Sequence, residues 1–258
     1  MKTDRLIEII GATIGLFGLA GASMNCASHD DAGPATCEEA KSAYGVSVDG
    51  PQILYVGGDK TMPWSAYCVG MATQQAVEYL ELDTHNGSAN FSEFRESSNS
   101  TAFTVRTQFR KVRIDPVNLT IDSTDKKFTD KTITPPHTAA SSAVLLRTID
   151  YMPYGAAETC GAFNDMHAKA NVDLSNGPFE VATAACKTLG ENTVTHDDPP
   201  TQTFDFSSAN AGTGAAGPPT CGRASLNCLP DPAVNGEVGG QGKIQLHYTG
   251  YGAASPRP

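Results

Sequence analysis

Residues 36–94 carry the runs that decide this fold: TCEEA at 36–40, DGPQILY at 49–55, YCVGM at 67–71, EYLEL at 78–82 and NFSEF at 90–94. In the first run Thr36 precedes Glu39 by three residues, a capping box in which each side chain satisfies a backbone amide where a helix begins. Gly45 ends this helix, since glycine tolerates the left-handed conformation found after a last helical turn. The runs that follow predict short strands at 52–56, 66–69 and 77–82.

Composition and charge limit the classes of protein to which this chain can belong. The 258 residues are enough for one large domain or two small ones, and the net charge of −10 disfavours duplex nucleic acid or an anionic membrane as a partner. Residues 1–22 have a basic start, a mostly apolar run and small residues at 20–22, which predicts an export signal; an amphipathic N-terminal helix is the alternative. No later run reaches the roughly 18 apolar residues that a membrane-spanning helix needs.

The cysteines indicate an oxidising compartment. Cys26 stands apart, just after the apolar segment, and six further cysteines could form three disulfides. Cys26 is either the lipidated N-terminus of a bacterial lipoprotein or a free thiol in a polar tail, and the sequence leaves both interpretations open. The six are Cys37, Cys68, Cys160, Cys186, Cys221 and Cys228.

The remaining organisation follows from local patterns. We expect a disordered tether at 23–35, an ordered body at 36–250 and a disordered tail at 251–258. A hairpin is predicted from 104–115 and 119–125, a helix around 162–170, a second hairpin within 172–181 and a closing strand at 243–248. Residues 130–145 are interpreted as an insertion, and the Pro/Gly-rich residues 197–219 as a surface loop.

The order of these runs resembles the GON domain, the C-terminal module of the secreted ADAMTS zinc metalloproteases. The resemblance continues in the run FRKVRID at 109–115, in VDLSNG at 172–177 and in the CGR run at 221–223 with Cys228. Cys37 and the Tyr67-Cys68 run predict a disulfide between Cys37 and Cys68, which would stabilise the fold by about 3–4 kcal/mol. The alternative is two buried free thiols, which fits an exported protein less well. The opening segment also resembles fibrinogen-type domains. The pairing of the other four cysteines stays open.

Catalytic motifs are missing from the sequence. None of the six histidines begins the His-Glu-x-x-His pattern of a zinc protease, so zinc enters through the family resemblance alone. The glycine-rich run at 212–217 matches a dinucleotide fingerprint but lacks the flanking strand and helix, and the acidic segments at 29–31 and 196–198 are typical of solvated loops. We therefore predict no catalytic residue, no metal site and no cofactor.

One basic cluster is a candidate binding patch for an acidic glycan or protein: Arg106, Arg110, Lys111 and Arg113. The alternative is a solvated strand face whose cations pair across strands with Asp122 and Asp125. Trp64, the single tryptophan, is expected in the core.

These observations predict a β-rich α+β fold, one extracytoplasmic domain with short helices and up to three disulfides. The predicted function is a non-catalytic binding module, secreted or held at a bacterial envelope, whose partner is an extracellular protein or glycan. The alternatives are a component associated with a secreted zinc metalloendopeptidase, as the resemblance implies, and an envelope structural lipoprotein.

Overall fold

The structure is a computed structural model, in which the chain divides into two units, Met1–Asp31 and Ala32–Pro258. All described residues belong to the second unit, so the predicted export signal and Cys26 lie outside them. The described residues are 32–73, 75–98, 101–134, 151–161, 167–175, 177–182, 195–196, 203–207, 221–225 and 243–250.

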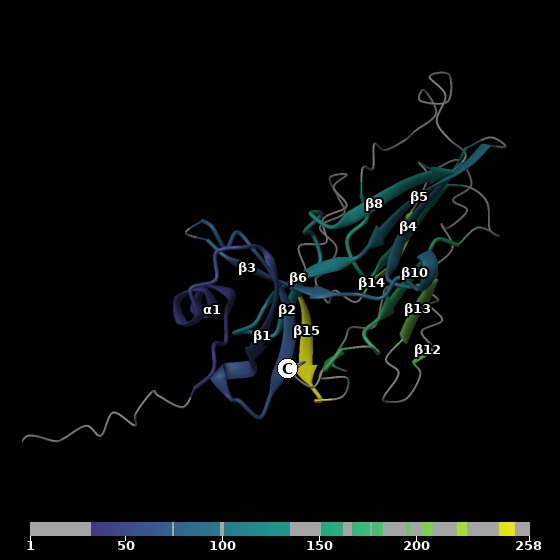
Figure 1. The fold of residues 1–258 in the computed structure, drawn as a ribbon. Helices are drawn as coiled ribbons and strands as arrows, with labels where there is room; N and C mark the ends of the chain where they lie inside the picture. The colour runs from purple at the N-terminus through teal and green to yellow at the C-terminus, as the bar shows by residue number, and fades with distance from the viewer. Residues whose placement is uncertain are drawn as a thin grey trace, which may run out of the picture. The chain divides into compact units, whose positions relative to one another are not determined.

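The first sheet is antiparallel throughout and has seven strands in the order β1-β2-β3-β6-β7-β15-β11. Its first three strands form a meander, and β6 and β7 form a hairpin with Arg113 opposite Asp122. The predicted hairpin of 104–115 and 119–125 is confirmed only in this part, because residues 104–109 belong to a strand of the second sheet. Figure 1 shows α1 beside β1, β2 and β3. The strands are β1 (Gly50–Tyr55), β2 (Pro63–Val69), β3 (Val77–Glu81), β6 (Lys111–Asp115), β7 (Thr120–Asp122), β11 (Phe179–Val181) and β15 (Lys243–Tyr248).

The second sheet has eight strands, six of them in the order β12-β13-β10-β4-β5-β8. The other two are β9, which runs parallel to β4, and β14, which pairs antiparallel with β9. The strands are β4 (Phe91–Ser98), β5 (Thr101–Phe109), β8 (Thr129–Thr134), β9 (Ala156–Gly161), β10 (Lys169–Asp173), β12 (Thr195–His196), β13 (Thr203–Ser207) and β14 (Cys221–Ser225).

Helical structure is sparse within the described residues. The α-helix α1 spans Cys37–Tyr44, and two 3-10 turns, η2 and η3, span Val56–Gly58 and His85–Gly87. The predicted cap is present: Thr36 Oγ1 accepts a hydrogen bond from the Glu39 N–H, and Gly45 has a left-handed φ of 66°. The Glu39 carboxylate accepts from the amide of Ala35. None of the described helices is long and apolar enough to cross a membrane.

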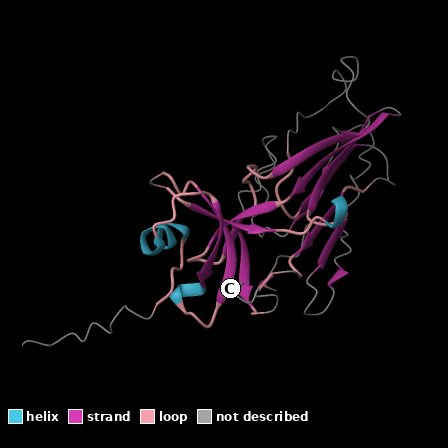
Figure 2. Cartoon of the chain, in the orientation of Figure 1, coloured by secondary structure: helices cyan, strands magenta, loops and turns pink. Residues whose placement is uncertain are grey.

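The predicted α+β class is therefore wrong, because the described structure is built from strands, with one eight-residue helix (Figure 2). The helix expected around 162–170 is contradicted at its end, where Lys169 and Ala170 begin β10 between β13 and β4. Ala170 and Val172 are buried there, so pairing within the sheet overrides the helix propensity of alanine. Residues 162–166 lie outside the described part.

The predicted hairpin within 172–181 is also wrong. β10 belongs to the second sheet, whereas β11 pairs with β15 in the first. Two predicted loops contain strands, since β8 falls in the expected insertion and β13 in the expected surface loop. The closing strand is present as β15, with Ile244 and Leu246 buried and the residues on either side of each exposed.

One hydrophobic cluster takes buried residues from both sheets, among them Leu54, Phe109 and Val172. Trp64 is 1% exposed and packs its ring against the edge of Phe179, with the centroids 5.3 Å apart. The core position expected for this tryptophan is confirmed.

The ordered structure begins before the predicted boundary at residue 36. The Tyr55 N–H donates to the carbonyl of Pro34, and the Gly33 N–H donates to the carbonyl of Gly58. A Cβ at Gly33 would overlap the ring of Tyr55, so only glycine allows the chain to lie this close to the ring. Residues 32–35, which the sequence assigned to the tether, are thus packed on β1.

Candidate functional site

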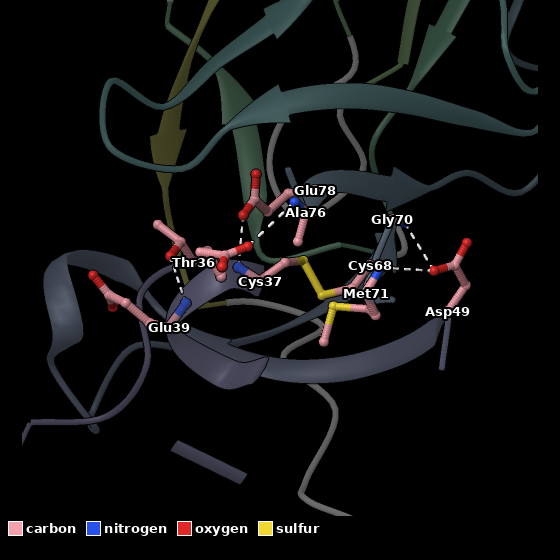
Figure 3. The surroundings of a disulfide bond; sticks show 10 residues. Thr36, Cys37, Glu39, Asp49, Cys68, Gly70, Met71, Ala76 and Glu78 are labelled. Atoms are coloured by element: carbon pink, nitrogen blue, oxygen red, sulfur yellow. Dashed lines mark hydrogen bonds between the residues drawn. A yellow bond between two sulfur atoms is a disulfide. The ribbon is translucent and has the colours of Figure 1, made fainter. Parts of the chain in front are cut away.

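The disulfide expected between Cys37 and Cys68 is present, with the two Cα atoms 5.6 Å apart. It joins the first turn of α1 to β2, and both cysteines are fully buried (Figure 3). Asp49, just before β1, accepts hydrogen bonds from the amides of Gly70 and Met71 at 2.8 and 2.9 Å and fixes the turn that follows Cys68. This region is a covalently closed structural unit.

Glu78 on β3 is the buried acid of this unit. Its Oε1 accepts a hydrogen bond of 2.6 Å from the amide of Cys37, and its backbone lies opposite Cys68 in the β2–β3 register. Burial raises the pKa of the Glu78 carboxyl above its ordinary value, although the hydrogen bond from Cys37 acts in the opposite direction. The side chain therefore serves to hold the start of α1 on the sheet.

A pocket of about 440 Å³ lies beside the N-terminus of α1 and is lined by Glu78, Arg113, Asp115, Asp122 and Lys243, among others. Two of its carboxylates, those of Asp115 and Asp122, accept hydrogen bonds from other residues of the chain. Asp115 accepts from the Asn118 side chain, which lowers the pKa of the Asp115 carboxyl, and it lies 3.7 Å from the Lys243 ammonium. Asp122 accepts from Thr124. The pocket combines both signs of charge and favours neither an anion nor a cation.

The face of β2 and β3 that points away from Cys68 and Glu78 carries a cluster of lysines and aromatic rings, which we call the lysine–aromatic face. Successive residues of a strand point to opposite faces, so Tyr67 and Tyr79, partners in the β2–β3 register, lie away from Cys68 and Glu78. Phe128 packs edge-on against both tyrosines, with centroid distances of 5.7 and 4.8 Å. The face comprises Tyr67, Phe128, Tyr151, Lys111, Lys126, Lys127 and Lys131.

The ammonium groups of this face lie near the rings at cation–π distances. Lys111 Nζ is 4.1 Å from the Tyr67 centroid, and Lys127 Nζ is 5.9 Å from that of Phe128. Lys126 and Lys131 each place Nζ 5.3 Å from the centroid of Tyr151. Such contacts restrict the lysine side chains and hold several positive charges on one surface of an acidic protein.

The four basic residues predicted to form one patch are separated by the structure. Arg106, on β5, forms an ion pair of 3.2 Å with Glu93 and stacks over the ring of Phe91. Arg110 pairs with Asp130 at 3.0 Å, where both side chains are more than half exposed. Lys111 belongs to the lysine–aromatic face and pairs with Glu81. Arg113, two residues further along β6, lies opposite Tyr79 and Asp122 and lines the pocket beside α1.

The sequence analysis missed Lys126, Lys127, Lys131 and the rings that hold them. A usable signal was present, since KKFTDK at 126–131 places three lysines around one phenylalanine. The partners Tyr67 and Tyr151 are remote in sequence and could not have been connected to this run by spacing.

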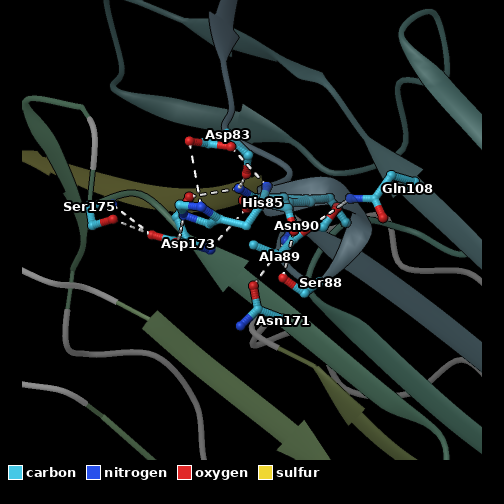
Figure 4. Close-up of polar contacts among 10 residues, drawn as sticks. Asp83, His85, Ser88, Ala89, Asn90, Gln108, Asn171, Asp173 and Ser175 are labelled. Carbon is cyan, nitrogen blue, oxygen red and sulfur yellow. Dashed lines mark hydrogen bonds and ion pairs between the residues drawn. The ribbon is translucent and has the colours of Figure 1, made fainter.

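A second polar cluster surrounds His85, in the crossover from β3 to β4 (Figure 4). His85 Nε2 is 3.1 Å from Asp173 Oδ2, and Nδ1 is 3.6 Å from Asp83 Oδ2. Within the described part of the chain, no group of three or more histidine, cysteine or acidic residues has the arrangement to hold a metal ion.

Asn90 is the centre of this cluster and is completely buried. Its side-chain amide donates to the carbonyls of Asp83 and Asp173, and its Oδ1 accepts from the Asp173 N–H and the Tyr154 hydroxyl. Burial, with a further contribution from the Asp173 charge, raises the pKa of Tyr154 well above its ordinary value, so the hydroxyl stays a donor. The cluster connects the crossover to β10, which is a structural role.

Comparison with known families agrees with the sequence-based resemblance over the N-terminal part of the chain. Residues 34–104 match the model of the GON domain. This segment contains the disulfide, the strands β1–β4 and two of the aromatic residues around Phe128, Tyr67 and Tyr79. No curated protein and no solved structure matches the chain. The predicted context of ADAMTS-type proteases and the fibrinogen-like opening receive no support from these comparisons.

Proposed function

We propose that this chain is a non-catalytic extracellular interaction module of the GON type, which binds its partner through the lysine–aromatic face. The observation that carries the proposal is the concentration of four lysines around three partly exposed rings, in a chain whose net charge is −10. The GON match and the buried disulfide support an oxidising, extracellular setting.

Like charges so close together on a folded surface repel one another, and neighbouring acids usually compensate them. Lys111 has such a partner in Glu81. In the described part of the chain, no acidic side chain forms an ion pair with Lys126 or Lys127, and both side chains are exposed. These two ammonium groups are therefore available to an anionic partner, an acidic extracellular protein or an acidic glycan.

The test compares three forms of the exported chain on arrays of extracellular proteins and polysaccharides. They are the wild type, the Lys126→Ala/Lys127→Ala variant and a Lys60→Ala/Lys169→Ala control, which loses the same charge at exposed positions outside the face. We expect the wild type and the control to share ligands that the face variant loses. Ligands that all three forms bind equally would contradict the proposal.

The alternative is a component of secreted zinc metalloendopeptidase activity, which is favoured only by the GON match. Elemental analysis for zinc together with a casein-cleavage assay separates the two functions. Stoichiometric zinc and chelator-sensitive cleavage would contradict the binding-module function and favour a protease component. The envelope-lipoprotein alternative predicts palmitate labelling of the chain that Cys26→Ala abolishes.

A further inference from the structure

We infer that the partner of the lysine–aromatic face is an anionic polysaccharide, a sugar chain that carries carboxylate or sulfate groups at regular intervals. This inference rests on the proposed function and specifies its ligand. It follows from the arrangement of the charges, from the chemistry of the cations and from the kind of residue that this face lacks.

The face consists of two similar subsites. In the first, Lys111 and Lys127 flank Phe128, with ammonium–centroid distances of 5.5 and 5.9 Å. In the second, Lys126 and Lys131 flank Tyr151 at 5.3 Å each. Lys126, Lys127 and Phe128 are consecutive, so their Cα atoms span at most about 7.6 Å and the subsites are adjacent. Two neighbouring sites of the same chemistry suit a ligand with repeated anionic groups.

The cations of the face are lysines, which bind oxyanions as point charges with three rotatable donors. Contact with the rings limits their motion, so less side-chain entropy is lost when a ligand binds. A flexible anionic chain can be bound by such lysines without a fixed donor geometry. Planar bidentate recognition of a single carboxylate or phosphate would instead favour arginine.

A protein partner fits less well. Protein interfaces are depleted in lysine and are centred on large apolar or aromatic anchors that become fully buried. Among the described residues, the exposed large hydrophobic side chains are Tyr44, Val48 and Val117, and none belongs to the lysine–aromatic face. Its rings are instead engaged with one another and with the lysines. Duplex nucleic acid is a polyanion as well, so the net charge does not separate it from an acidic polysaccharide, and the experiment includes DNA as a comparison.

The experiment measures affinity of the exported chain for heparin oligosaccharides and polygalacturonate by calorimetry, with neutral dextran and duplex DNA as comparisons. We expect binding to one or both acidic polysaccharides, weakened by added salt, and none to dextran. Lys126→Ala/Lys127→Ala should weaken it about tenfold or more, which corresponds to about 1.4 kcal/mol, whereas Lys60→Ala/Lys169→Ala should change it less than about threefold. Unchanged unfolding midpoints establish that both variants are folded.

Two results would overturn the inference. If the chain binds neither acidic polysaccharide but the face variant still loses a protein ligand on the arrays, the ligand class is wrong and the proposed function stands. If acidic polysaccharides bind but the two double variants lose affinity equally, or if DNA binds as tightly, the attraction is non-specific and the face is not the site. If no ligand on the arrays depends on the face, the proposed function itself is refuted.

Discussion

Glu78 and Cys37 are joined by a hydrogen bond of 2.6 Å between Oε1 of the buried carboxyl and the first amide of α1. The side chain of Cys37 is at the same time bonded to Cys68, the residue opposite Glu78 on the neighbouring strand. One helical residue is thus held through its backbone by β3 and through its sulfur by β2. The position of α1 depends on both links.

The burial of the Glu78 carboxyl predicts a pH dependence of stability. Because burial raises the pKa of Glu78 in the folded state, the folded protein binds this proton more tightly than the unfolded chain does. The contribution of Glu78 to the free energy of unfolding is therefore largest below its unfolded pKa, near 4.5, and is lost as the pH rises through the folded value. Glu78→Gln removes this dependence but keeps an oxygen acceptor for Cys37.

Urea unfolding of the wild type and Glu78→Gln between pH 4 and 7 tests this, with Glu81→Gln as the exposed control on the same strand. As the pH rises, the wild type should lose free energy of unfolding relative to Glu78→Gln. Glu78→Ala, which leaves the Cys37 amide without its partner, should cost about 1–3 kcal/mol at pH 4 and less as the pH rises. Parallel pH profiles for the wild type and Glu78→Gln would contradict the assignment.

The disulfide predicts a larger effect. Cys37 and Cys68 are 31 residues apart, and opening a loop of this size costs about 3–4 kcal/mol on chain-entropy reasoning. The double variant Cys37→Ala/Cys68→Ala should lose this amount in chemical denaturation, and the reduced wild type should lose a similar amount. The loss of stability in the double variant should exceed that in Glu78→Ala. If it is smaller than in Glu78→Ala, the Glu78 hydrogen bond and not the disulfide positions the helix.

A second disulfide can be assigned from strand register. Cys160 is disulfide-bonded, and Cys221 is its direct neighbour across the antiparallel β9–β14 ladder. Opposite residues in such a ladder have Cα atoms about 4.5–5.5 Å apart, within the range that a disulfide spans. We predict a Cys160–Cys221 bridge, which leaves Cys186 and Cys228 for a third. Mass spectrometry of peptides from the unreduced protein checks this, and a peptide linking Cys160 to Cys186 or Cys228 would disprove it.

The success of the sequence-based predictions depended on the range of the interactions. The α1 cap, the β6–β7 hairpin and the alternation in β15 are set by neighbours within a few residues, and the structure has all three. β10 could not be predicted in this way, because Ala170 and Val172 become strand residues by pairing with Phe206, Phe204 and Ser92.

The lysine–aromatic face was missed for the same reason. Tyr67, Lys111, Phe128 and Tyr151 come from four separate segments, and pairing of β3 with β6 brings Lys111 beside the β2–β3 hairpin. Their spacing in the sequence predicts that Arg106, Arg110, Lys111 and Arg113 are neighbours. The chain bends at Arg110, however, and β5 and β6 belong to different sheets. Proximity in sequence was therefore a poor guide to a shared surface.

The buried amide of Asn90 provides a prediction with a matched control. Asn90 and Asn86 both have left-handed backbones, with φ of 55° and 57°, and aspartate tolerates this conformation as asparagine does. Asn90→Asp removes two N–H donors and directs a carboxylate oxygen at the carbonyls of Asp83 and Asp173, so it should cost about 3 kcal/mol or more at neutral pH. Asn86→Asp changes the same atoms on an exposed residue and should cost less than about 0.5 kcal/mol. Chemical denaturation of both variants measures the difference; equal losses would show that the cost arises from the backbone conformation and that the amide network around Asn90 does not hold the crossover to β10.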